Sequence, residues 1–259
     1  MRIAIITGAS SGMGAEFVRQ CAADWDGLEE IWILARRRER LETLKREVEA
    51  SFHSFGPVIR PFVLDITEQS EREAFFAQVK QETPQVRLLI NCAGVGKNGL
   101  FGSETCGRET DMVRLNCEAL LAMTYGVLPY LRSGSHIMHM ASAAAFTPQP
   151  EFAVYAATKA FVYSFSRALA QELKGRGIYV TAVCPGPVDT EFLNIAGSGK
   201  QVTWYKRFVM AKAGPVVKQA IRDAQKGKTE SIYGLPMKLC KAAGKLLPWN
   251  IILMLYRKK

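Results

Sequence analysis

A tyrosine, a lysine and a serine near the middle of the chain have the spacing of a proton-transfer site. Tyr155 and Lys159 stand four residues apart, so on a helix they share one face. A free tyrosine has a pKa of about 10 and is a poor base at neutral pH, but a cation one turn away favours the phenolate. The hydroxyl of Ser142 can hydrogen-bond a carbonyl oxygen. These groups suit proton transfer at an alcohol oxygen while a hydride moves on the carbon, and the hydride requires a cofactor.

A glycine-rich turn at the start of the chain supplies a place for such a cofactor. Gly8, Gly12 and Gly14 follow an apolar run and precede a helical pattern. Glycine permits a tight turn that approaches a pyrophosphate closely, and the first N–H groups of the next helix bind phosphate oxygens. The predicted cofactor contacts in this turn are Gly8, Ser10, Ser11, Gly12, Met13 and Gly14.

The residues that end the second and third predicted strands indicate which dinucleotide binds. An acidic residue about 20 positions after the glycines would bond a ribose 2′-hydroxyl and indicate NAD. Arg36 and Arg37 occupy that place instead, and because arginine pairs with a 2′-phosphate, the sequence favours NADP (NADPH). Asp65, followed by Ile66, ends the third strand, where its carboxylate can accept from an adenine amino group.

Strands and helices alternate along the chain. Apolar runs over 2–7, 30–35, 58–64, 87–91, 136–141 and 178–184 are typical of buried strands, and helical patterns over 13–24, 39–50, 68–82, 107–131 and 152–174 separate them. This alternation predicts an α/β fold with one doubly wound, Rossmann-type parallel sheet, covered by helices on both faces, in a single domain over 1–259. Ligands of such a sheet bind beyond the carboxyl ends of its strands. Asn91, Ala93 and Gly94 end the fourth strand, where small residues let a cofactor pass closely.

Together these motifs resemble those of the short-chain dehydrogenase/reductase family, over residues 2 to about 190. TGASSGMG from Thr7 is similar to the family's TGxxxGxG, NCAG at 91–94 to its NNAG, and CPGPVDT at 184–190 to its PGxxxT segment. Asn116, Ser142, Tyr155 and Lys159 match the four catalytic positions one by one.

The resemblance implies a role for each of these residues. Tyr155 is the general acid in reduction and the base in oxidation, and Ser142 orients the carbonyl oxygen. Lys159 lowers the tyrosine pKa and bonds the nicotinamide ribose, while Asn116 holds a water that links Lys159 to solvent. The contacts to the nicotinamide end are Pro185, Gly186, Val188 and Thr190. The resemblance also implies a homo-oligomer, a dimer or tetramer, formed through the helices predicted over 107–131 and 152–174.

The substrate is less determined than the chemistry. Phe101, Phe146 and Phe152, in loops around the motifs, favour a bulky apolar ketone or secondary alcohol over a sugar. We expect an NADP(H)-dependent oxidoreductase for an apolar substrate of the hydroxysteroid or bile-acid type, which in one interpretation is also anionic. A 3-oxoacyl thioester is the alternative substrate. A non-catalytic NADP(H)-binding sensor is the alternative of another class.

The formal charge of +10 is concentrated in the last quarter of the chain. Residues 200–259 hold 14 of the 34 Lys and Arg residues but only Asp223 and Glu230 of the acidic ones. We expect a substrate lid over 191–228 and a basic, apolar C-terminal extension over 235–259. Three interpretations of this charge stay open: solvated lysines with the extension packed on another subunit, an extension lying on an anionic membrane surface, or steering of an acidic substrate. The predicted lid residues are Phe192, Lys200, Trp204, Tyr205, Lys206, Arg207, Phe208 and Lys212.

Other classes of protein find no support in the sequence. No helix-turn-helix, zinc-finger or RNA-binding motif accompanies the basic residues, so no nucleic-acid partner is expected. The six cysteines show no CxxC pair and no metal spacing with the three histidines, which predicts reduced thiols, no metal site and packed histidines. No secretory leader precedes the first strand and no apolar run reaches the ~20 residues of a spanning helix, so we expect a cytoplasmic protein.

Overall fold

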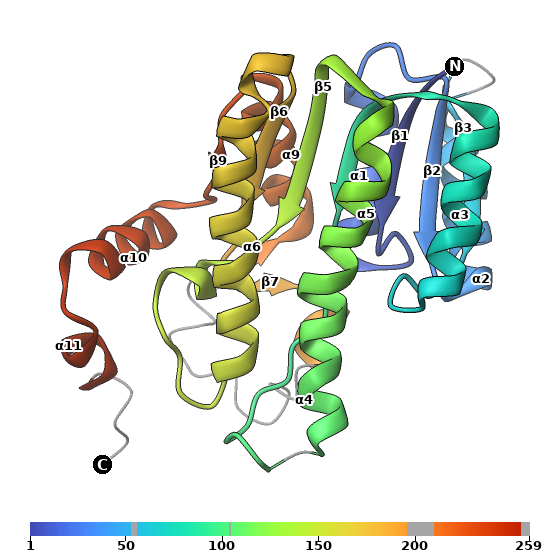
Figure 1. Ribbon diagram of the computed structural model, residues 1–259. Coiled ribbons are helices and arrows are strands. Elements are labelled where there is room, and N and C mark those ends of the chain that lie inside the picture. The colour runs from blue at the N-terminus through green and yellow to red at the C-terminus, as the bar shows by residue number, and fades with distance from the viewer. Residues whose placement is uncertain (53–55, 104, 196–209, 255–259) are drawn as a thin grey trace.

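A seven-stranded parallel sheet forms the centre of the computed structural model, which describes residues 1–52, 56–103, 105–195 and 210–254 (Figure 1). The strand order is β3-β2-β1-β4-β5-β6-β9, and every neighbouring pair is parallel. The order reverses between β1 and β4, as in a doubly wound sheet, which confirms the predicted fold class. The strands are β1 (Arg2–Thr7), β2 (Glu30–Ala35), β3 (Val58–Val63), β4 (Gln85–Asn91), β5 (Leu131–Met140), β6 (Tyr179–Val183) and β9 (Glu230–Ser231).

The central strand β1 shows why both faces of the sheet are covered. Successive side chains of a strand point to opposite faces, and in β1 every side chain after Arg2 is buried. Ala4 and Ile6 belong to one apolar cluster, which we call the first cluster, and Ile3 and Ile5 belong to the second cluster on the other face. A strand without a polar side is stable only when helices remove both of its faces from water.

Two layers of helices provide this cover (Figure 1). Helices α1, α2 and α9 pack into the first cluster, and α3, α5 and α6 pack into the second. Their bounds are α1 (Gly12–Asp24), α2 (Arg38–Ser51), α3 (Gln69–Glu82), α5 (Leu120–Val127), α6 (Ala153–Glu172) and α9 (Ala213–Gln225). Each crossover returns the chain to the same end of the sheet, so the residues that follow the strands converge at that end.

The single helix predicted over 107–131 is wrong in its interior and at its end. The stretch contains α4 (Cys106–Val113), a π-helical segment over Arg114–Ala119, then α5 and a 3₁₀ turn over Leu128–Tyr130. Pro129 lies in that turn, where its missing N–H and fixed φ do not allow the α-helix to continue. Leu131 already begins β5, so the strand starts before the predicted 136–141.

The part of the chain after β6 contains elements that the sequence did not predict. β9 extends the sheet beyond β6, and β7 (Val188–Asp189) pairs with β8 (Ala211–Lys212) in a separate two-stranded sheet. α7 (Glu191–Ile195) begins the predicted lid, and α10 (Leu235–Leu246) and α11 (Trp249–Met254) lie in the C-terminal extension. Strands of two residues are too short for any periodic signal. The predicted lid residues Lys200, Trp204, Tyr205, Lys206, Arg207 and Phe208 lie outside the described residues.

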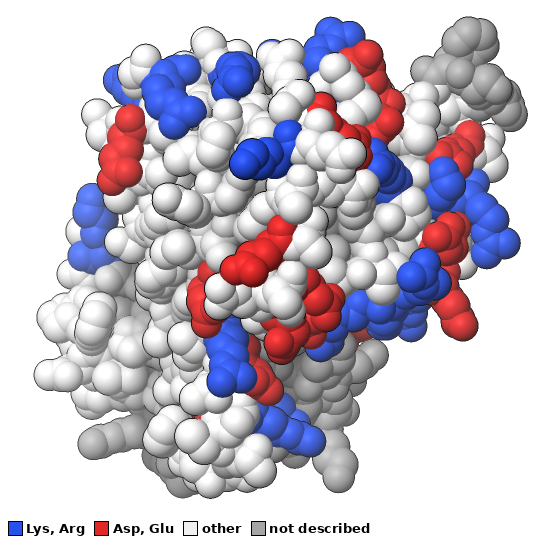
Figure 2. Space-filling model, turned by 45° about the vertical axis from the view of Figure 1, so that its right-hand side comes forward, with Lys and Arg blue, Asp and Glu red and all other residues white. Residues whose placement is uncertain are grey.

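The described residues also bear on the predictions about surface charge, membrane-spanning helices, metal sites and cysteines. On the face shown in Figure 2, Lys and Arg are interleaved with Asp and Glu, so the basic excess of the chain is not gathered there. Within the described ranges no helix is both long and apolar enough to span a bilayer, and no group of His, Cys, Asp and Glu could hold a metal ion. All six cysteines are free thiols, as predicted.

His139 is packed between β5 and the helices α5 and α6, which confirms that it is a packed histidine. Its ring is fully buried, stacks on Phe165 and lies 3.1 Å from the Thr124 hydroxyl and 2.9 Å from the Ser166 hydroxyl. Burial lowers the pKa of His139 to about 3, so the ring is neutral at pH 7. A neutral ring donates from one nitrogen only, and the hydroxyls of Thr124 and Ser166 themselves donate to the backbone carbonyls of Leu120 and Val162.

This lowered pKa predicts a fold that loses stability in mild acid. The unfolded chain takes up a proton on His139 near pH 6.5, whereas the folded chain resists it down to about 3. The free energy of unfolding is therefore greatest above pH 6.5 and falls below it, by at most about 1.4 kcal/mol per pH unit for this group.

Urea titrations between about pH 5.5 and 6.5 measure this slope. His139→Gln, whose amide can bond both hydroxyls, should flatten it. His136, whose pKa burial lowers to about 4, supplies the slope that remains. An identical slope in the variant and the parent protein would exclude His139 as the cause.

Candidate functional site

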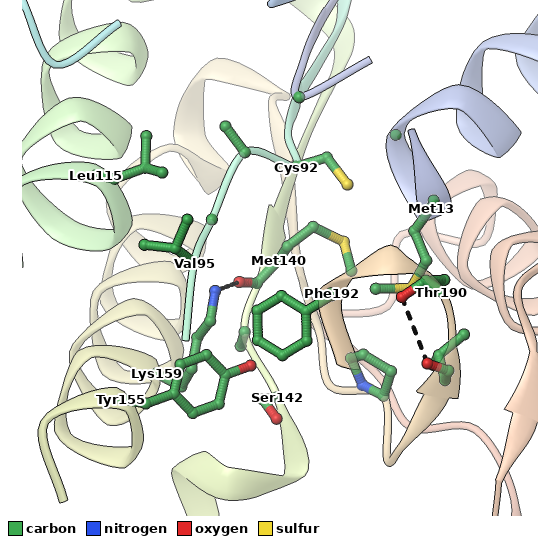
Figure 3. Close-up of a pocket in the computed structure, with 18 of the residues that line it drawn as sticks. Met13, Cys92, Val95, Leu115, Met140, Ser142, Tyr155, Lys159, Thr190 and Phe192 are labelled. Carbon is green, nitrogen blue, oxygen red and sulfur yellow. Dashed lines mark hydrogen bonds between the residues drawn. The ribbon is translucent and has the colours of Figure 1, made fainter. Parts of the chain in front are cut away.

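A cavity of about 1100 Å³ lies at the carboxyl ends of the strands β1 to β6. It gathers residues from motifs that are far apart in the sequence, and Figure 3 shows the part around Tyr155, Lys159 and Ser142. The predicted site residues that line it are Gly8, Ser10, Ser11, Gly12, Met13, Gly14, Arg36, Arg37, Asp65, Ile66, Ala93, Gly94, Ser142, Tyr155, Lys159, Pro185, Gly186, Val188 and Thr190.

The glycine turn is held by close packing of backbone on backbone. Gly8 and Gly12 have φ values of +70° and +54°, which glycine adopts freely. A Cβ on Gly14 would lie 2.1 Å from the carbonyl oxygen of Gly8, and a Cβ on Gly8 would lie 2.7 Å from the backbone of Ala93. The Thr7 hydroxyl accepts from two successive N–H groups after β4, both at 3.1 Å, which fixes that strand end beside the turn. The turn thus presents bare backbone to the cavity, and this cradle fits a pyrophosphate.

Arg37 forms the rim of the cavity next to the glycine turn. Its guanidinium donates to the hydroxyls of Ser10 at 2.9 Å and Ser11 at 2.8 Å. It also pairs with Glu191 of α7 at 3.1 Å, and Arg40 binds the other oxygen of the same carboxylate. Hydrogen bonds from these two arginines hold the pKa of Glu191 below its ordinary value. An anionic ligand group at this rim would meet the two serine hydroxyls and the guanidinium of Arg37.

Asp65 is fixed on the same rim, at the end of β3. Its carboxylate accepts from the N–H of Thr67 at 2.9 Å and from the Thr67 hydroxyl at 2.7 Å. It also pairs with Arg36 at 3.2 Å, and the Arg36 side chain is 70% exposed. Burial raises the pKa of Asp65, but the hydrogen bonds from Thr67 and the charge of Arg36 together outweigh burial and hold that pKa below its ordinary value. The carboxylate is therefore ionised and oriented at neutral pH.

Tyr155 lies inside the cavity with its hydroxyl directed toward Ser142 (Figure 3). Its ring stacks on Phe152 with 4.2 Å between the ring centroids and meets Phe192 of α7 at 5.5 Å. Burial raises the pKa of Tyr155 to about 12, and the Ser142 hydroxyl acts in the opposite direction. Ser142 itself is oriented because its oxygen accepts from the N–H of Ala144 at 3.1 Å. The phenol is consequently protonated at neutral pH and can donate a proton to a neighbouring oxygen.

Lys159 is a buried amine on the same face of α6. Its Nζ donates to the carbonyl oxygen of Met140 at 2.7 Å and lies 5.6 Å from the centroid of the Tyr155 ring (Figure 3). Burial lowers the pKa of Lys159 to about 8, so the amine begins to lose its charge just above neutral pH. In this structure burial, rather than the lysine, dominates the pKa of Tyr155.

Two predicted site residues lie behind the cavity wall and do not line it. Asn116, fully buried on the π-helical segment, accepts from the N–H of Val95 at 2.9 Å and donates to the carbonyl of Val95 at 2.8 Å and to the hydroxyl of Thr158 at 3.0 Å. Asn91, predicted as a direct cofactor contact, is buried below the strand end and donates to Thr124 at 3.0 Å. Asn116 thus ties the segment after β4 to α6, and Asn91 ties β4 to α5.

Helix α10 supplies a wall of the cavity that the sequence did not reveal. Met237 and Cys240 of this helix line the cavity. A Cβ on Gly186 would lie 2.6 Å from the sulfur of Met237, and one on Gly244 would lie 2.4 Å from the carbonyl oxygen of Phe146, so glycine permits both close contacts. The helical spacing of Met237, Cys240 and Gly244 is the only sequence signal for this wall, and any amphipathic helix shares it.

These features, a bare glycine turn at the switch point of a parallel sheet and a buried, protonated tyrosine in the same cavity, are those expected of an oxidoreductase that uses a dinucleotide. The sequence profile described as short chain dehydrogenase matches residues 2–200. The chain therefore belongs to the short-chain dehydrogenase/reductase family, whose members use NAD(P)(H) and act on alcohol and ketone groups.

Proteins similar to this chain differ in the substrates and cofactors that their names give. The very-long-chain 3-oxoacyl-CoA reductase of Pyrenophora tritici-repentis is 33% identical over 214 residues, which cover 80% of this chain and 61% of that protein. A short-chain dehydrogenase from Sphingobium yanoikuyae in complex with NADPH superposes with a TM-score of 0.80 and 24% identity, covering 100% of this chain and 97% of the other. A short chain dehydrogenase/reductase from Burkholderia phymatum in complex with NAD also gives a TM-score of 0.80, at 19% identity, covering 99% and 95%. Both structures share the fold of this chain.

The close approach of Gly14 to Gly8 predicts that position 14 tolerates no side chain. In Gly14→Ala the new methyl would stand 2.1 Å from a carbonyl oxygen, so the turn must move. Overpacking of this kind costs about 1–3 kcal/mol, and we expect roughly tenfold or weaker binding of a nicotinamide dinucleotide and a lower Tm. Gly107→Ala is the matched control, because nothing lies within 4 Å of its Cβ. Equal binding by the two variants would show that the approach does not limit the turn.

Proposed function

We propose that this chain is an NADP(H)-dependent oxidoreductase that interconverts a ketone and a secondary alcohol on a bulky apolar substrate. The observation that carries the proposal is the Tyr155 phenol, which burial keeps protonated, directed toward Ser142 in a cavity that also contains the bare glycine turn. Proton transfer and dinucleotide binding are thereby brought to one place.

In this proposal the proton moves at the hydroxyl of Tyr155. The protonated phenol donates to the carbonyl oxygen in reduction, and the phenolate accepts from the alcohol in oxidation. Ser142 donates a second hydrogen bond to the same oxygen and stabilises the charge that develops there. Lys159 is charged below a pH of about 8 and favours the phenolate that reduction leaves behind. Asn116 acts by positioning the backbone around Lys159, and a bound nicotinamide supplies or accepts the hydride.

The rim at the end of β2 supports NADP over NAD. Arg36 and Arg37 stand where the adenosine ribose binds in this class of fold, and the Ser10 hydroxyl of the glycine turn lies 2.9 Å from the Arg37 guanidinium. Guanidinium groups and a hydroxyl match the oxygens of a 2′-phosphate. The nearby carboxylates that could bond a 2′-hydroxyl, Asp65 and Glu191, are already paired with arginines.

The other end of the cavity supports an apolar substrate. Phe152, Phe192, Leu193 and Met237 line it, and these side chains favour a hydroxysteroid of the bile-acid type. A 3-oxoacyl thioester is the second candidate, and the 33% sequence identity with a very-long-chain 3-oxoacyl-CoA reductase favours it. Turnover of a panel of ketones, followed through NADPH absorbance, separates the two classes and excludes a non-catalytic sensor.

We assign the whole chain, 1–259, to one catalytic unit with a lid that begins at 191. The sequence predicts a lid over 191–228, but α9 (Ala213–Gln225) packs into the first cluster and covers the sheet instead. The contact of Phe192 with the Tyr155 ring supports this position for the start of the lid. We assign α5 and α6 to the contact between subunits of a homo-oligomer, a dimer or tetramer. Leu121, Tyr125 and Phe161 on these helices are 44%, 78% and 41% exposed, which supports a covering partner.

Tyr155→Phe keeps the ring and removes the proton. Because general acid–base catalysis contributes ~10²–10⁴-fold, kcat should fall by a comparable factor while the dinucleotide still binds. Tyr163→Phe, the same substitution on the same helix at a tyrosine that bonds Glu230, should leave kcat near that of the parent protein. Steady-state kinetics with a substrate ketone measure both, and near-normal kcat in Tyr155→Phe would remove this residue from the mechanism.

Arg36→Asp should weaken the binding of NADPH and leave the binding of NADH almost unchanged. A charge-assisted hydrogen bond to phosphate contributes about 1.5–3 kcal/mol, so the KM for NADPH should rise roughly tenfold or more. Arg38→Asp changes the charge equally at an exposed neighbour that does not line the cavity, and it should have little effect. A parent enzyme that prefers NADH would contradict the assignment at once.

A further inference from the structure

The C-terminal extension stands out from the body of the protein and exposes an apolar surface. In Figure 1, α10 and α11 project beyond α6. Leu235, Leu239 and Leu246 of α10, which we call the leucine stripe, are 68%, 61% and 77% exposed. On α11, Trp249 and Met254 are 61% and 64% exposed. Large apolar side chains gathered on one projecting segment mark a surface of contact.

The leucine stripe points outward because the opposite face of α10 is fixed to the body. The three leucines fall on one side of the helix, whereas Met237 and Gly244 fall on the other. Met237 lines the cavity, and Gly244 packs on the carbonyl of Phe146. Lys241 binds the carboxylate of Glu230 on the edge strand β9. Packing on one face and an ion pair therefore hold the helix so that the stripe stays exposed.

The charges of the extension are all of one sign. Residues 235–259 contain six Lys and Arg residues and no Asp or Glu. Lys238 and Lys245 are exposed and follow the same border of the leucine stripe. A helix with an apolar stripe beside lysines lies in the interface of an anionic bilayer, with its apolar side chains at the boundary of headgroups and acyl chains. Trp249 is of the type that prefers this depth.

A second copy of the chain matches this surface less well. A two-fold contact centred on this surface would bring the same patch of both copies together, so the lysines of one copy would lie close to those of the other. The extension offers no carboxylate to compensate them, and like charges across an interface are unfavourable. Anionic headgroups provide the opposite charge over an apolar layer.

We infer that α10 and α11 dock the protein onto an anionic lipid surface. The leucine stripe and Trp249 enter the headgroup boundary, and Lys238 and Lys245 contact the lipid phosphates. Because Met237 and Cys240 on the inward face of α10 line the cavity, the docked helix lies between the lipid and the cavity. The inference does not depend on the substrate or the cofactor of the enzyme.

Sedimentation of the full chain with vesicles tests this surface. The protein is mixed with vesicles of phosphatidylcholine alone or of phosphatidylcholine with phosphatidylserine. We expect binding to the phosphatidylserine vesicles that weakens as salt screens the lysines, and little binding to the neutral ones. Leu239→Asp should weaken binding roughly tenfold or more, since it removes an inserted side chain and adds an anion. Lys238→Glu with Lys245→Glu should do the same, because each basic residue near the surface adds roughly fivefold.

Lys218→Glu on α9 with Lys226→Glu just after it is the matched control, because it changes the net charge equally at exposed residues outside the extension. This control pair should leave vesicle binding intact, and thermal melts establish that every variant folds. The inference is overturned if the parent protein never sediments with phosphatidylserine vesicles, or if Leu239→Asp binds them as well as the parent. Dissociation of an oligomer by Leu239→Asp in light scattering, without vesicle binding by the parent, would also overturn it and make the stripe a subunit contact.

Discussion

The arrangement around the cavity depends on how closely the first helix passes over the first turn. The space above the Gly8 carbonyl is filled by the backbone of Gly14, so α1 starts directly over the end of β1. This proximity lets Thr7 hold the end of β4 and lets the N-terminus of α1 face the cavity. A helix displaced outward by one side chain would separate the glycine turn from the residues that follow the other strands.

Burial is the second constraint, and it acts on the two central titratable groups in opposite senses. The pKa of Tyr155 rises and that of Lys159 falls, because a low-dielectric cavity disfavours the charged form of each. The carbonyl of Met140 is the polar partner that lets the lysine remain in this place. Because the pKa of Tyr155 is about 12 and that of Lys159 about 8, the tyrosine keeps its proton rather than passing it to the lysine, so the phenol remains the proton donor of the cavity.

The sequence predicted those parts of the site whose position follows from the strand pattern around them. Gly8 and Asp65 fall where an apolar run ends, and parallel strands bring such ends together. The sequence could not show that Asn116 lies on a π-helical segment and accepts a hydrogen bond from Val95. A π-helical segment is too short to have a recognisable apolar pattern of its own. The pairing of Arg37 with Glu191 and the wall formed by α10 depend on tertiary packing between distant segments, which no local pattern contains.

The two outer strands of the sheet have a consequence for how the protein meets other molecules. An exposed strand edge invites a further strand from another chain. β3 contains Pro61, which has no N–H to offer, and its neighbour Arg60 lies over the Trp32 ring and pairs with Glu82. β9 is only two residues long and begins with the charged Glu230. Neither outer strand therefore offers a long regular edge on which the sheet could continue into a second molecule, which is the route to fibrous aggregation.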